Sequence, residues 1–113
     1  MIITNLSRNI VLSSKAELAS SFFSRMRGLL GRNELDEGEG MVITHCNSIH
    51  MFFMKFPIDV VFVNKENIVV GLVKNIAPWN MSPVFWAAAQ AIELPAGMIE
   101  YSATALGDRI EIK

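Results

Sequence analysis

The stretch IDVVFV, residues 58–63, constrains the fold more than any other part of the sequence. Its β-branched and aromatic residues favour a strand. Side chains alternate between the two faces of a strand, and both faces of this one are apolar, so the strand should be covered on both sides. A turn-forming segment, NKEN at 64–67, leads into a second apolar run, IVVGLV at 68–73. Together they predict a β-hairpin.

Length and composition define the class of protein. The chain has 113 residues, of which 51% are hydrophobic and 19% charged, with a net charge of −1. One globular domain over residues 1–113 is predicted, because two separate cores of this size would each be marginal. The near-neutral charge disfavours a nucleic-acid partner. Cys46 is the only cysteine. An internal disulfide is therefore excluded, and a reducing compartment is compatible with the sequence.

The first 21 residues lack a charged region followed by an unbroken apolar run, so no signal peptide is expected. The longest apolar stretch, residues 49–63, is interrupted by Lys55, Pro57 and Asp59. It does not have the pattern of a membrane span. We therefore expect a cytoplasmic protein with no membrane contact.

A helix is expected near the N-terminus, over residues 15–27, because apolar residues recur there at helical spacing. Ser14 and Glu17 have the spacing of a capping box. Gly28 is a suitable residue to follow the last turn.

Shorter patterns predict the remaining elements. The segment 86–94 is ambiguous, because its alanines favour a helix whereas the short run before Pro95 allows a strand. The other expected elements are a hairpin of residues 2–5 and 9–12, a loop at 36–40, strands at 41–44 and 109–112, an irregular loop at 74–85, and a short helix after Gly97 up to about residue 103.

Several blocks of the sequence resemble the family called domain of unknown function 192, an uncharacterised ancient conserved region. The blocks are RMRGLLGR, GMVITHCNSIHMFFMKFPIDVVFVN, IVVG, a proline-containing loop, AIELPAG and LGDRIEI, in that order over residues 25–113. The resemblance implies a small, single-domain, mostly β fold and brings no particular activity with it. It also implies that the segment AAAQAIEL is a strand. The complete fold expected is one α+β domain of mostly antiparallel strands in a small barrel-like sheet. The N-terminal helix should pack across one opening, and a second short helix should follow Gly97.

Both histidines and the only cysteine lie in one segment, HCNSIH at 45–50, which raises the possibility of a metal site. Cys46 and His50 would suit Cu(I) or Zn, and on a helix their spacing would allow chelation. On a strand they lie about 13 Å apart, which is too far for one ion. The metal site is therefore a minor alternative, and we expect no metal and no cofactor.

A nucleophilic thiol is the second possibility for this segment. Cys46 would need His45 or His50 as a base, and Asp59 or Glu93 could orient that base. The competing interpretation is that Cys46 is a small buried hydrophobic residue, as free cysteines commonly are. His50 would then be half-buried and bonded to backbone.

Asp59 and Glu93 are single carboxylates in apolar surroundings, FPIDVVFV and AIELPAG. They could form an acid–base pair on adjacent strands or belong to two separate salt bridges. For Asp59 we predict a covered carboxylate that is held either by a basic side chain or by backbone N–H groups.

Two classes of function follow. The first is a non-enzymatic module that binds a small ligand or another protein through a groove near His50, Asp59 and the Trp79 loop. The second is a small hydrolase- or transferase-like enzyme that uses Cys46 and His50 or an Asp59–Glu93 pair. The first is favoured, because the sequence contains no nucleophile elbow, phosphate loop or strong metal motif. The oligomeric state is not predicted. The candidate binding residues are His45, Cys46, His50, Asp59, Trp79 and Glu93.

Overall fold

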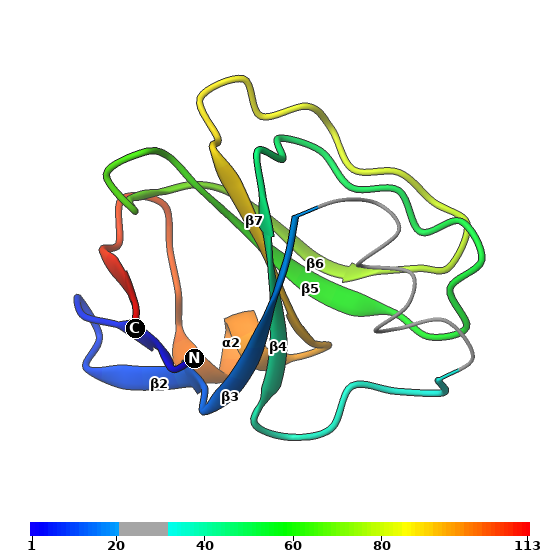
Figure 1. The fold of residues 1–113 in the computed structure, drawn as a ribbon, viewed down its shortest axis with the longest axis horizontal. Helices are drawn as coiled ribbons and strands as arrows, with labels where there is room; N and C mark the ends of the chain where they lie inside the picture. The colour runs from blue at the N-terminus through cyan, green and yellow to red at the C-terminus, as the bar shows by residue number, and fades with distance from the viewer. Residues whose placement is uncertain (21–31) are drawn as a thin grey trace.

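The computed structural model describes residues 1–20 and 32–113. Within them the protein consists mainly of strands (Figure 1). The elements are β1 (Ile3–Asn5), β2 (Ile10–Ser13), β3 (Lys15–Ala19), β4 (Glu39–Thr44), β5 (Ile58–Val63), β6 (Val69–Ile76), β7 (Gln90–Pro95), α2 (Met98–Ser102) and β8 (Ile110–Ile112). Among the described residues no helix has the length and apolar character needed to cross a membrane.

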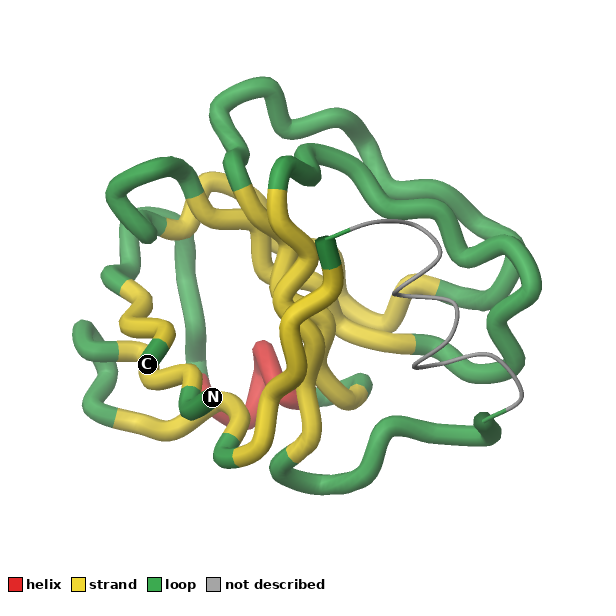
Figure 2. Tube along the Cα trace, viewed as in Figure 1, coloured by secondary structure: helices red, strands yellow, loops and turns green. Residues whose placement is uncertain are grey.

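The strands form two sheets. The larger has the order β3-β4-β7-β5-β6 and the smaller the order β2-β1-β8. Strands β3 and β4 run parallel, and the other neighbours are antiparallel. Among the described strands each sheet has two edge strands and does not close on itself, so the barrel-like closure expected from the sequence is wrong. Figure 2 shows the small sheet and α2 on one side of the large sheet, and long loops on the other.

Strand β5 explains why the core has two halves. All six of its residues are buried, as the two-sided apolar pattern predicted. Val61 and Val63 pack with the small sheet and α2, in a cluster that includes Ile3 and Ile99. The alternate residues of β5 face a second cluster, which is covered by loop residues. Burial on both faces makes β5 the centre of the molecule.

The N-terminal helix is the main error of the sequence-based prediction. Residues 15–19 form β3, which pairs in parallel with β4. Ser14 does not cap a helix, because the residues that follow it form β3; its backbone N–H and that of Lys15 both donate to the carbonyl oxygen of Gly38, at 3.0 and 3.1 Å. Pairing with β4 and burial of Ala16 and Ala19 outweigh the helical spacing. The rest of the expected helix, 21–27, and Gly28 lie outside the described residues.

The remaining elements lie close to their expected positions. The two hairpins are present, as β1–β2 and β5–β6, and β6 continues to Ile76. The ambiguous alanine-rich segment ends in a strand, β7, as the resemblance implied. The described residues contain one helix, the five-residue α2, which directly follows Gly97.

Candidate functional site

Two long loops run side by side over one face of the large sheet, and we call them the loop ribbon (residues 45–56 and 77–89; Figure 1). Backbone hydrogen bonds join the loops along their length. Met51 accepts from Trp79 and donates to Asn80, both at 2.7 Å, and Ser82 donates to Ile49 at 2.8 Å. The ribbon continues the β4–β7 pair, because the N–H of Cys46 donates to the carbonyl of Ala89 at 3.1 Å. It therefore has fixed backbone geometry although it is not regular sheet.

The ribbon has an apolar inner side. Ile49, Met51, Met54 and Phe56 are buried and belong to the core cluster beneath. The hydroxyl of Ser82 supports this side, because it accepts a hydrogen bond from the N–H of Ile49 at 2.8 Å. The inner residues anchor the ribbon to the sheet, so the side chains on its outer surface are held in place.

The outer side carries an aromatic cluster, which we define as His50, Phe52, Phe53, Trp79 and Met81. Ring centroids are 4.8 Å apart between His50 and Phe52, and 6.0 Å between Phe52 and Trp79. Phe53 meets Trp79 edge-on at 5.0 Å. Exposed fractions are 37% for Phe52, 56% for Phe53, 59% for Trp79 and 66% for Met81. The cluster is thus a contiguous apolar surface open to solvent.

The backbone at this cluster is held in an unusual conformation. Phe53 and Trp79 have φ angles of 68° and 69°, in the left-handed region that bulky residues rarely adopt. Each such residue costs of order 1–3 kcal/mol and persists only where its surroundings enforce it. In this case the hydrogen bonds of the ribbon enforce the conformation at Trp79, whose N–H donates to Met51.

His45 and Cys46 lie apart from the cluster, at the end of the ribbon next to β4. They line a recess of about 510 Å³ together with Lys65, Trp86 and their neighbours. The thiol of Cys46 donates to the carbonyl oxygen of Ser48 at 3.0 Å. Only the protonated thiol can make that bond, so it favours the less nucleophilic form. Among residues 1–20 and 32–113, no group of three or more His, Cys, Asp or Glu side chains is placed to hold a metal ion.

Asp59 is covered, and backbone groups hold it, as predicted. Its carboxylate is 1% exposed. One oxygen accepts from the N–H of Asn75 at 2.8 Å. The other accepts from the N–H groups of Gly97 and Ile99, at 3.1 and 2.8 Å. The carboxylate thus joins β5, β6 and the start of α2. We call this arrangement the Asp59 clamp.

The predicted groove that would contain His50, Asp59 and Trp79 is not formed. Asp59 lies opposite Leu94, on the face of the large sheet that α2 and the small sheet cover. The aromatic cluster stands on the ribbon, which covers the other face. Asp59 therefore has a structural position and is not among the surface groups.

The predicted Asp59–Glu93 pair is also wrong. Glu93 lies opposite Val60, the neighbour of Asp59 along β5. Adjacent residues of a strand point to opposite faces, so the two carboxylates are on different sides of the sheet. Glu93 is completely buried on the ribbon side. The two groups cannot share a proton or a substrate.

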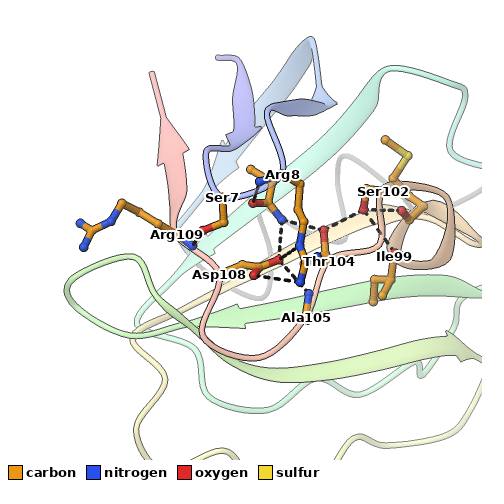
Figure 3. Close-up of polar contacts among 10 residues, drawn as sticks. Ser7, Arg8, Ile99, Ser102, Thr104, Ala105, Asp108 and Arg109 are labelled. Atoms are coloured by element: carbon orange, nitrogen blue, oxygen red, sulfur yellow. Dashed lines mark hydrogen bonds and ion pairs between the residues drawn. The ribbon is translucent and has the colours of Figure 1, made fainter.

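A buried polar network centred on Asp108 was not predicted from the sequence (Figure 3). Its carboxylate accepts from Arg8 Nε and from Asn5 Nδ2, both at 3.0 Å, and from the N–H of Ala105 at 2.9 Å. Burial alone would raise the pKa of Asp108, but the bonds from Arg8, Asn5 and Ala105 together lower it below its ordinary value. The network ties the β1–β2 turn to the loop before β8. The only sequence signal near this network is the turn-forming pair Gly107–Asp108.

Comparisons of the sequence with known proteins agree on one family, and a comparison of structures identifies a similar fold. A family model described as Uncharacterized ACR, domain of unknown function 192, matches residues 3–112. A UPF0127 protein of Thermococcus sibiricus is 34% identical over 111 residues, covering 95% of this chain and 71% of that protein. A UPF0127 protein of Pyrococcus abyssi is 33% identical, covering 97% and 96%. A crystal structure of a protein of unknown function from Novosphingobium aromaticivorans superposes with a TM-score of 0.80 at 24% identity, covering 98% of this chain and 82% of that one.

Proposed function

The chain belongs to the domain of unknown function 192 family, and from its geometry we propose that it is a non-enzymatic protein-interaction module. The contact surface is the aromatic cluster on the loop ribbon. The observation that carries the proposal is the exposure of Phe52, Phe53 and Trp79, whose rings meet one another, with exposed Met81 paired to His50 beside them. Exposed apolar patches of this kind on soluble domains mark binding surfaces.

The residue types support a protein partner. Tryptophan and other aromatic residues dominate the energetics of protein interfaces, because they bury a large area with few rotatable bonds. The cluster also has a rigid base, since Met51 and Met54 beneath it are buried in the core. A rigid surface loses little entropy on binding.

The chemistry of the cluster defines the partner as a protein surface with large apolar side chains. Lys55 and Asn80 are exposed within the same two loops. They supply a polar rim of the kind that surrounds apolar interface centres. Neither rim residue carries negative charge, so a partner with acidic groups around its apolar centre fits better than a basic one.

Selection from a random peptide library tests the proposal. The wild-type protein and the Trp79→Ser variant are used as parallel baits, and Trp86→Ser serves as a matched control because Trp86 is 84% exposed but lies outside the cluster. We expect peptides rich in aromatic and acidic residues that bind wild type and the control. Their affinity for Trp79→Ser should be about tenfold or more lower, the loss typical of an interface anchor. Peptides that bind Trp79→Ser equally well would refute the cluster as the contact surface.

A second candidate, a small enzyme using Cys46, is favoured by one observation. The recess beside β4 brings Cys46, His45, Lys65 and Trp86 around one cavity of a size that small ligands occupy. Alkylation of Cys46 by iodoacetamide across a pH series distinguishes the candidates. An ordinary thiol reacts slowly below its pKa of about 8.5. Fast reaction near pH 6 would favour the enzyme, and ordinary behaviour would favour the interaction module.

A further inference from the structure

A second surface, independent of the aromatic cluster, lies at the other side of the molecule between β2 and α2. It is a groove of about 600 Å³. One wall consists of residues 10–14, which are β2 and the residue after it. The opposite wall includes Ala96, Met98 and Tyr101, and Glu37 lies on the lining as well. Figure 1 shows α2 beside β2 at this position.

The wall formed by β2 is a strand edge. Five consecutive residues line the groove, whereas a strand that presented one face would contribute only alternate residues. Strand β2 is the end member of the small sheet, and its only neighbour among the described strands is β1. On the edge away from β1 the N–H of Ser14 already donates to the carbonyl oxygen of Gly38 at 3.0 Å, so the backbone groups that face the groove are those of residues 10–12 that point away from β1.

The strand has few of the features that prevent an edge from pairing. Its sequence, IVLS, contains no proline and no charged residue. Val11 is 46% exposed, and Tyr101 on the opposite wall is 77% exposed. The groove thus offers backbone hydrogen bonds along one side and apolar contacts along the other.

We infer that this groove binds an extended peptide segment of a partner protein, which adds to β2 as a further strand. Strand addition is an established way for domains to recognise extended peptides, with backbone bonds providing affinity and side-chain pockets providing specificity. Among the described residues that line the groove, Glu37 is the only charged one. The segment that fits carries apolar side chains, and a lysine or arginine at the position that meets Glu37.

A peptide fits this edge better than a second copy of the chain. The β1–β2 ladder has a register shift between Ile3 and Thr4, which leaves Leu12 without a partner on β1. Such a bulge bends the strand and limits long edge-to-edge pairing. A short segment of three or four residues can still pair alongside the strand.

Titration of the isotope-labelled protein with synthetic peptides, followed by amide chemical shifts, tests the inference. The probe is acetyl-Lys-Val-Thr-Val-Thr-amide. Two comparison peptides are used: the same peptide N-methylated at alternate amides, and a version with glutamate in place of lysine. We expect shifts in the amides of residues 10–14 and 96–101. N-methylation should weaken binding about tenfold or more, because it removes the backbone bonds.

Variants of exposed residues assign the contacts without disturbing the fold. Glu37→Lys should weaken binding of the lysine peptide and strengthen binding of the glutamate peptide, each several-fold. Tyr101→Ala should weaken both, whereas Leu106→Ala serves as a control, since Leu106 is 66% exposed and does not line the groove. Equal binding of the N-methylated peptide would overturn strand addition. Absence of shifts at millimolar peptide, or a dimer formed through β2 that peptide does not displace, would overturn the inference as well.

Discussion

Replacing Asp59 by alanine should destabilise the protein strongly, because the Asp59 clamp is assembled from three backbone donors. The N–H of Ile99 is buried, while those of Asn75 and Gly97 are partly buried. A donor left without its acceptor costs about 1–3 kcal/mol, with the larger values where water cannot replace the acceptor. Taking about 1 kcal/mol for each partly buried donor and up to about 3 kcal/mol for the buried one gives a total of ~3–5 kcal/mol. That is a large fraction of a typical stability of ~5–15 kcal/mol.

Thermal melting at pH 7 measures this effect. For a chain of this length the loss corresponds to a decrease in Tm of roughly 10–20 °C. Asp59→Asn should lie between wild type and alanine. Its amide oxygen can accept from Gly97 and Ile99, but its NH₂ group then faces the N–H of Asn75. Asp36→Ala is the matched control, since Asp36 is exposed. An alanine variant that melts within ~2 °C of wild type would refute the account of the clamp.

Three further perturbations have expected outcomes. Because the pKa of Asp108 is lowered, the stability that Asp108 contributes is fully present above the ordinary pKa range of a carboxyl group and is lost as the pH falls through the lowered pKa. When Tm is measured from pH 7 to pH 2, it should therefore fall less steeply at the acid end in Arg8→Met than in wild type, and parallel profiles would contradict this. Gly71→Ala should lower stability by ~1–3 kcal/mol in urea melts, because the added methyl group would overlap the Phe85 ring, and an unchanged midpoint would argue against that packing. Trp79→Gly should remove peptide binding at the aromatic cluster but change Tm little, since glycine relieves the positive φ at this exposed site; loss of fold would contradict a purely surface role.

The sequence predicted correctly those elements in which the local residue pattern and the tertiary packing favour the same secondary structure. The range predicted for β5, 58–63, is the range observed, because its β-branched residues are buried on both faces. For β3 the local pattern and the packing disagree. The spacing of Ala16 and Ala19 suits a helix, yet residues 15–19 align beside β4, which lies more than twenty residues further along the chain. No local signal reports a parallel pairing of this kind.

For the candidate site too, the local sequence predicted burial but did not predict the partners of the buried group. Burial of Asp59 followed from its apolar neighbours, but its partners Gly97 and Ile99 lie at the start of α2, 38 and 40 residues further along the chain. All four residues of the segment MFFM, 51–54, are hydrophobic, yet only Met51 and Met54 are buried. Phe52 and Phe53 are exposed, and Phe53 has a positive φ of 68°. Hydrophobicity alone therefore does not distinguish the buried residues of this segment from the exposed ones.

The pairing of β1 with β8 has a consequence for the order of folding. Ile3 lies opposite Ile112, so the small sheet joins opposite ends of the sequence, whereas the β5–β6 hairpin joins near neighbours. Contacts between such distant residues form slowly, because the intervening chain must first collapse. The β1–β8 ladder therefore closes late, whereas the β1–β2 hairpin joins near neighbours. A substitution that weakens only the β1–β8 ladder would therefore speed unfolding and leave the folding rate nearly unchanged.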